Sequence, residues 1–150
     1  MKYPTKRFGI VDVTTDQVLT FPEGLIGFQS CRKFIVMNLD KTGILKWLQS
    51  LDDESLGFAI LDPRMAFKDY DPVFTPKDLE PLSASDPGEL ILLSVVTVPR
   101  DIKKMTANLQ APLVINPKKR LGKQVISIVP EYTTRHMVFL PLQNLMKRTG

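Results

Sequence analysis

The segment Leu90-Ile91-Leu92-Leu93-Ser94-Val95-Val96-Thr97-Val98 decides the class of fold. Successive side chains of a strand point to opposite faces, and here both faces are apolar. The two faces hold three apolar side chains each: Ile91, Leu93 and Val95 on one, and Leu92, Val96 and Val98 on the other. We therefore expect a central strand that is covered on both sides. Pro99 ends it, because proline has no N–H to donate to a neighbouring strand.

The rest of the chain repeats this β pattern in shorter pieces. Twelve prolines and eight glycines interrupt it, and the stretches between them are rich in Val, Ile, Leu, Phe and Thr. The pattern predicts a mainly β fold with strands over residues 5–10, 17–21, 33–39, 45–49, 57–61, 89–98, 106–110, 113–116 and 123–129. Ala111-Pro112 interrupts the region 106–116, which suggests one strand that bends into the next.

Helical signals are few. Thr75 precedes Pro76, and Asp78 stands in the first turn, so the sequence predicts a short helix that begins there. A single turn over 101–105 and a terminal helix over 142–147 are also compatible with the sequence. The chain has 150 residues, no internal repeat and no long linker, so we expect a single domain over residues 1–150.

Composition and charge narrow the class of protein. The first eight residues lack the apolar stretch of a secretory signal, and the apolar run 90–93 is far too short to span a membrane. Cys31 is the only cysteine, which suits a reducing cytoplasm. Residues 52–89 carry ten Asp and Glu against three Lys and Arg, whereas residues 100–150 carry two against ten. This asymmetry predicts either two differently charged faces or charges that interleave in the fold.

Residues able to support catalysis are scarce. His136 and Cys31 are each alone in their class, which excludes a zinc cluster of four such ligands. Asp52-Asp53-Glu54 offers carboxylates for Mg²⁺ or acid–base chemistry, but its place between two apolar runs favours a hairpin turn. No nucleotide-binding glycine motif occurs, and Gly24-Leu25-Ile26-Gly27 is better interpreted as a turn than as an RNA-binding loop. We expect no enzymatic activity and no cofactor.

A basic turn is the strongest signal for nucleic acid. Lys118, Lys119, Arg120 and Lys123 follow Asn116-Pro117 between two predicted strands, and four cations can neutralise phosphates. The turn contains no aromatic side chain for base stacking. Two interpretations remain: a small RNA-binding module, or a basic surface that is solvated or contacts an acidic protein.

Several uncommon strings, taken in order, resemble the flagellar assembly factor FliW family over nearly the whole chain. The strings are Thr5-Lys6-Arg7-Phe8-Gly9, Phe21-Pro22-Glu23-Gly24-Leu25-Ile26-Gly27-Phe28, Trp47-Leu48-Gln49-Ser50-Leu51-Asp52-Asp53, Phe58-Ala59-Ile60-Leu61-Asp62-Pro63, Val96-Thr97-Val98-Pro99, Gly122-Lys123-Gln124-Val125 and Arg135-His136. The most specific runs from Met105 through Thr106-Ala107-Asn108-Leu109-Gln110-Ala111-Pro112 to Asn116-Pro117. The resemblance implies a compact, mostly antiparallel β fold with barrel-like curvature and one or two short helices.

The resemblance also implies two protein partners. Members of this family bind flagellin in the cytoplasm before its export. When free of flagellin they bind the translational repressor CsrA, which relieves repression of flagellin synthesis. On this basis the acidic region 52–89 is expected to face the basic repressor, and the mechanism is an exchange of partners with no bond made or broken.

Residues with no evident role in folding are the expected contacts for a protein partner. They form a mixed aromatic and polar set of the kind that carries binding energy: Lys6, Arg7, Phe8, Phe21, Trp47, Gln49, Asn108 and Gln110, together with the basic turn. For Phe21 and Trp47 the alternative is core packing, because large aromatic side chains usually serve the core.

Overall fold

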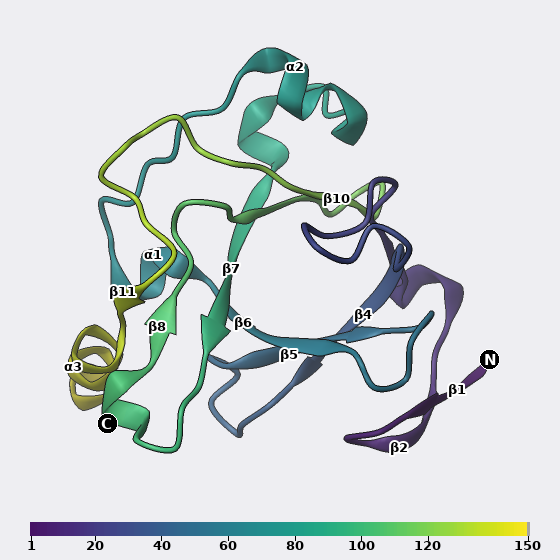
Figure 1. Cartoon of the computed structure of the whole chain (residues 1–150), viewed down its shortest axis with the longest axis horizontal. Helices are drawn as coiled ribbons and strands as arrows, with labels where there is room; N and C mark the ends of the chain where they lie inside the picture. Colours follow the sequence, from purple (N-terminus) through teal and green to yellow (C-terminus); the bar gives the residue numbers. More distant parts are fainter. Residues whose placement is uncertain (150) are drawn as a thin grey trace.

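Strand β7 (Ile91–Thr97) is where the sheet closes on itself. The computed structural model describes residues 1–149, with side chains described as far as Asn144. From β7 the sheet runs through β6 (Gly57–Leu61), β5 (Lys46–Ser50), β4 (Lys33–Asn38), β3 (Leu19–Thr20), β10 (Leu121–Gln124) and β9 (Leu113–Asn116), and β9 pairs again with β7. The result is a closed barrel of seven strands (Figure 1). The expected mainly β, mostly antiparallel fold with barrel-like curvature is confirmed.

The bend expected near Ala111-Pro112 is confirmed. Strand β8 (Thr106–Ala107) and strand β9 pair with the same edge of β7, one after the other. The five residues between them leave this edge as a loop, and β11 (His136–Met137) adds to the outer side of β8. The two predicted strands 106–110 and 113–116 are thus present as β8 and β9, separated by a bulge.

The burial of β7 corrects one expectation. Its middle is covered, since Val96 is 5% exposed and Ser94 is fully buried. Its two ends are open: Ile91 is 45% exposed, and Val98, just after the strand, is 46% exposed. Full cover on both faces therefore holds only for the middle of the strand, where other elements lie against it.

Four of the other predicted strands need correction as well. Residues 5–10 are mostly a turn between β1 (Lys2–Thr5) and β2 (Gly9–Asp12), because the Thr5 hydroxyl donates to Gly9 O and accepts from the Phe8 N–H. The segment 17–21 contains only the two-residue β3, after the 3-10 turn η1 (Thr15–Gln17). Strand β8 ends at Ala107. Strand β10 ends at Gln124, because N–H groups that follow Gln124 donate to carbonyl oxygens of loops. The ranges 57–61 and 113–116 are correct.

The helices are short, and each predicted one is present. In α2 (Pro76–Leu79) the Thr75 hydroxyl accepts from the Asp78 N–H, and Asp101 caps the single turn η4 (Ile102–Lys104). The terminal helix α3 (Phe139–Thr149) begins three residues earlier than expected. The sequence interpretation missed α1 (Pro63–Ala66), which Asp62 caps, and the 3-10 turns η2 (Glu80–Leu82) and η3 (Pro87–Glu89).

The apolar side chains form three clusters. The barrel interior holds Phe21, Phe34, Leu48, Ile60 and Leu113 among others. A second cluster on the outside of β6 and β7 is covered by α1, α3 and β11, and a third lies beneath α2 and η2. Figure 1 shows α3 beside β8 and β11, α2 at the far end from it, and the β1–β2 hairpin outside the barrel.

Candidate protein-binding surface

Trp47 is the centre of the surface that best fits a protein partner. It lies on the outer side of β5, opposite Met37 of β4 and Ala59 of β6. Its indole N–H donates to Gln49 Oε1 at 2.9 Å. The guanidinium carbon of Arg7 lies 4.7 Å from the centre of the indole ring, within the range of a cation–π contact. A Cβ atom at Gly57 would collide with the indole, so the glycine allows this close packing.

Gln49 lies beneath this pair and serves the fold. Its side-chain amide donates to the carbonyl oxygens of Ser50, Glu54 and Leu56, at 3.0, 3.3 and 3.1 Å. The residue is buried. This residue, expected from the sequence to contact a partner, instead fixes the β5–β6 turn and orients the indole of Trp47.

The turn of the β1–β2 hairpin brings three predicted residues to the same place. The Lys6 N–H donates to Glu54 O at 2.9 Å, which fastens this turn to the β5–β6 turn. Arg7 stacks on Trp47, and its Cζ also lies 5.9 Å from the ring centre of Phe8. Lys6 and Arg7 are exposed, and Phe8 is half-buried. The structure thus brings Lys6, Arg7, Phe8 and Trp47 together in one place, as members of a single binding surface would have to be.

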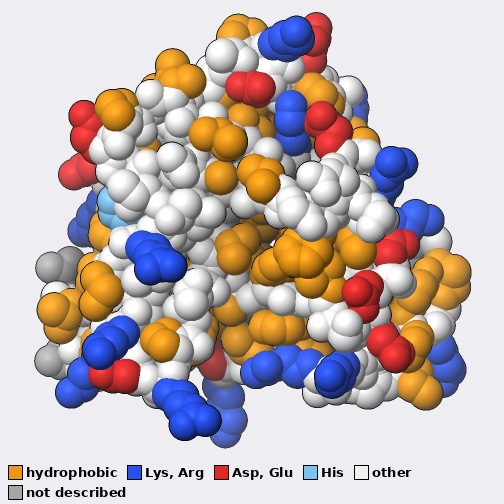
Figure 2. Space-filling model, in the orientation of Figure 1, with side chains coloured by type: hydrophobic (Ala, Val, Ile, Leu, Met, Phe, Trp, Pro, Cys, Tyr) orange, Lys and Arg blue, Asp and Glu red, His pale blue; other side chains and the backbone are white. Residues whose placement is uncertain are grey.

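An apolar groove of about 650 Å³ adjoins these residues. Side chains that the sequence interpretation did not select complete its walls: Leu39, Leu45, Phe58, Val95, Val96 and Val98. Figure 2 shows apolar side chains gathered in a hollow beside β5, β6 and β7, with Lys and Arg side chains along its lower edge. In the sequence, Val98 could have indicated this groove. It is an apolar side chain between the end of β7 and Pro99, where core packing has ended.

The remaining members of the predicted patch lie elsewhere. Phe21 is fully buried in the barrel and meets Phe34 edge-to-face, with ring centres 5.4 Å apart. The Asn108 side chain accepts from the N–H groups of Gln110 and Ala111, so it builds the bulge between β8 and β9. Gln110 is exposed on that bulge. For Phe21 the core interpretation is confirmed, and neither Asn108 nor Gln110 lines the groove.

Each cation of the basic turn has a partner within the chain. Lys118 Nζ lies 3.3 Å from Glu89 Oε1, and Lys119 Nζ donates to Ser83 O at 2.7 Å. Arg120 donates to Gln17 O at 2.7 Å. Lys123 donates to Asp78 O at 3.0 Å and lies 3.4 Å from Glu23 Oε2. Three of these four reach into the region 52–89, where Glu89 contributes a carboxylate and Ser83 and Asp78 contribute backbone carbonyl oxygens.

The acidic residues 52–54 form a turn, as the preferred interpretation expected. Asp52 Oδ2 accepts from the N–H groups of Arg32 and Lys33, at 2.7 and 2.9 Å. Asp53 Oδ1 accepts from the Ser55 hydroxyl and N–H, and these hydrogen bonds lower the pKa of the Asp53 carboxyl.

Among the described residues there is no group of three or more His, Cys, Asp or Glu suited to a metal ion. Within the described chain, no helix has the length and apolar character needed to cross a membrane.

Comparisons with known proteins agree with one another. A family model described as FliW protein matches residues 2–138. A flagellar assembly factor FliW of Natranaerobius thermophilus is 38% identical over 140 residues, which cover 93% of each chain. A second, from Leptospira interrogans, is 37% identical over 136 residues, or 90% of this chain and 91% of that one. A crystal structure of the flagellar assembly factor FliW superposes with a TM-score of 0.86 at 34% identity, over 93% of this chain and 97% of that chain.

Proposed function

The chain belongs to the FliW family, and from this membership we propose that it is a cytoplasmic flagellar assembly factor that acts by binding proteins and catalyses no reaction. Its two partners are flagellin and the translational repressor CsrA. Flagellin occupies the protein before export. Once flagellin leaves, the protein binds the repressor and flagellin synthesis resumes.

The groove beside Trp47 is the observation that supports a binding role. It combines an aromatic side chain, a stacked arginine and an apolar floor, which are the features that concentrate binding energy at protein interfaces. A filament subunit exposes apolar contact surface before it assembles, and such surface needs cover. We assign the groove to flagellin for this reason.

The repressor is assigned to the acidic side of the chain. Residues 52–89 carry the excess of carboxylates, and several of them, such as Asp69 and Asp71, are exposed. A basic RNA-binding partner is attracted to such a surface through long-range electrostatics. The basic turn is engaged with this same region, so it is a weaker candidate for an independent RNA site.

Calorimetric titration tests the exchange. Flagellin and CsrA should each bind the purified protein, and each should weaken the other's binding by the same factor, typically about 5–150-fold for distinct sites. A stable ternary complex with unchanged affinities would rule out the exchange and leave the binding roles. Absence of binding to both partners would overturn the proposal.

A pair of variants locates the flagellin site. Val98→Asp places a charge in the groove and should weaken flagellin binding at least about fivefold, as expected for a contact at the centre of an interface. Ile126→Asp is the matched control, because Ile126 is 58% exposed and does not line the groove. Equal affinities for the two variants would place flagellin on another surface.

A further inference from the structure

Four aromatic rings surround a recess between α1 and β11, away from the Trp47 groove. Phe67 and His136 lie edge-to-face with ring centres 6.0 Å apart, and Tyr132 and His136 lie 6.4 Å apart. Tyr70 and Tyr132 are closest, at 4.7 Å. The planes of these pairs differ by 67 to 72°. Neighbouring rings are therefore nearly perpendicular, like the walls of a box.

Hydrogen bonds to the backbone hold three of these rings in place. The Tyr70 hydroxyl donates to Leu109 O at 2.7 Å. The Asp71 N–H donates to the Tyr132 hydroxyl oxygen at 2.8 Å, and the Thr133 N–H donates to His136 Nε2 at 2.8 Å. The rings need little further ordering to receive a ligand, which lowers the entropic cost of binding.

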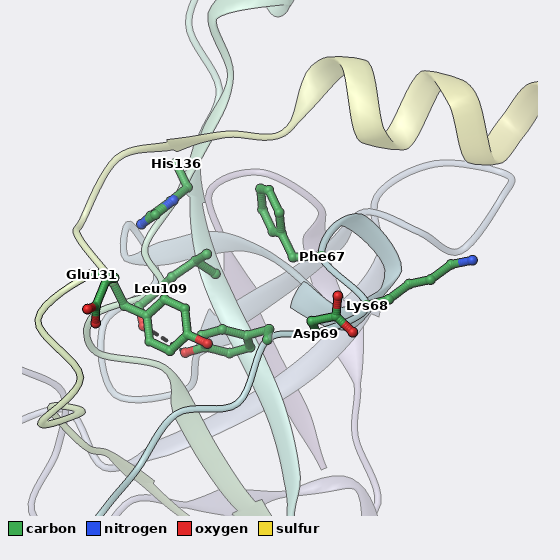
Figure 3. Close-up of a pocket in the computed structure, with 8 residues that line it drawn as sticks. Phe67, Lys68, Asp69, Leu109, Glu131 and His136 are labelled. Atoms are coloured by element: carbon green, nitrogen blue, oxygen red, sulfur yellow. Dashed lines mark hydrogen bonds between the residues drawn. The ribbon is translucent and has the colours of Figure 1, made fainter.

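The recess has a volume of about 400 Å³ and carries negative charge at its edge. Asp69 and Glu131 both line it and are both exposed. Figure 3 shows these two carboxylates on opposite sides of the rings, while the side chain of Lys68 extends away from them. Leu109 also lines the recess. Ring faces and carboxylates both attract cations, so the two features select the same class of ligand.

We propose that this recess binds an organic ammonium ion, supplied either by a lysine side chain of a protein or by a free quaternary ammonium compound. Aromatic boxes of this kind bind alkylated ammonium ions through the negative faces of their rings. The inference does not depend on the identity of the proposed partners.

Nuclear magnetic resonance titration of the full chain tests the proposal. The probes are N-acetyl-lysine methyl amide, its trimethylated form, and choline. N-acetyl-norleucine methyl amide is the uncharged control. Saturable shifts of the His136 imidazole resonances are expected with the cations and not with the control. Binding of the lysine probes alone assigns the site to a protein side chain, and binding of choline alone assigns it to a free compound.

Two sets of variants separate the contributions of the rings and the charges. Tyr132→Phe keeps the ring but loses the hydrogen bond from the Asp71 N–H, so it should bind only slightly more weakly than the wild type, whereas Tyr132→Leu should bind about tenfold more weakly. Asp69→Asn combined with Glu131→Gln should weaken binding about two- to fivefold. Asp12→Asn combined with Glu80→Gln is the matched control, because both residues are exposed outside the recess.

Three results would overturn the proposal. The first is that the norleucine control binds as tightly as the cations, and the second is that none of the cations binds. The third is that Tyr132→Leu binds the cations as tightly as Tyr132→Phe. The amide spectrum of each variant reports whether it is folded. If Tyr132→Leu does not fold, the comparison of the carboxylate variant with its matched control decides, and equal affinities there would remove the site.

Discussion

Tyr70 illustrates how one polar side chain can be accommodated in an apolar cluster. It is buried among the residues that cover β6 and β7, and its hydroxyl is satisfied by Leu109 O. Removal from water, reinforced by the neighbouring Tyr132, raises the pKa of Tyr70 far above its usual value, against a smaller opposing effect of Arg64. The phenol therefore stays protonated and remains a donor.

The raised pKa of Tyr70 leads to a prediction about alkaline stability. Its stabilising effect is fully present below the unfolded pKa of 10.0 and is lost as the pH rises above that value. Tyr70→Phe should lower the free energy of unfolding by about 1 kcal/mol near neutral pH, since a buried hydrogen bond is lost. The difference from wild type should shrink between about pH 8 and about pH 11 in urea unfolding. A difference between Tyr70→Phe and wild type that stays constant over this pH range would contradict the argument.

Individual residues show how much of the candidate protein-binding surface could be predicted from the sequence. Lys6, Arg7, Phe8 and Trp47 lie together, and Trp47 also packs against the second apolar cluster. Their role as partner contacts stays a prediction. Gln49 and Asn108 have the same polar character, but both bond to backbone groups in turns. That distinction depends on where the chain folds back, which no single residue reveals.

At the scale of elements, β7 has the central role, and its burial is uneven. Val96 packs with Ala59, Leu61 and Ala107 in the cluster on the outside of the sheet. Two residues later, Val98 is at the wall of the groove and half exposed. The same strand therefore supplies the core in its middle and a surface at its end.

This unevenness predicts opposite results for two similar substitutions. Val96→Asp buries an unpaired charge and should cost about 3 kcal/mol or more, which lowers the melting temperature by roughly 10 °C in a chain of this size. Val98→Asp should melt within about 2 °C of wild type, because the new charge reaches water. Thermal melting followed by circular dichroism gives both values. Similar melting temperatures for the two variants would contradict the burial pattern described for β7.

The strands that the sequence predicted well share a physical property. Those over 57–61 and 113–116 are rich in apolar side chains and largely buried, so their pattern reflects a tertiary environment. The strands β3, β8 and β11 have only two residues each. A strand of two residues is too short to show an alternation of apolar and polar side chains. For this reason its bounds could not be predicted from the sequence.

At the scale of the whole molecule, the two charged regions of the chain meet each other. Lys118 pairs with Glu89 of the acidic region, whereas Lys123 donates to the backbone oxygen of Asp78 in that region and pairs with Glu23 outside it. The side chain of Lys123 is 18% exposed, and that of Lys118 is 74% exposed. Part of the charge asymmetry in the sequence is therefore used to hold the fold together and is not available to partners.

Charge reversal should lower the free energy of unfolding more at Lys123 than at Lys118. Lys123→Glu leaves a largely buried carboxylate near Glu23 and should cost about 2 kcal/mol or more. Lys118→Glu should cost at most about 1 kcal/mol, and less at high salt, because exposed ion pairs are weak and screened. Urea unfolding at low and high salt measures both. Equal losses would show that burial does not govern these contacts.

The junction between β3 and β10 should be one of the last contacts of the barrel to form. It is the parallel contact in the ring, with a single residue pair, Leu121 opposite Thr20, supported by the bond from Thr20 N–H to Arg120 O. The strands from β4 to β7 are antiparallel neighbours in the ring, whereas this contact joins residues about a hundred positions apart along the chain. Closing so long a loop is entropically unfavourable until other contacts hold its ends nearby. This seam should therefore form after the folding transition state and open first in native-state fluctuations, as the fastest route by which the interior exchanges hydrogen with water.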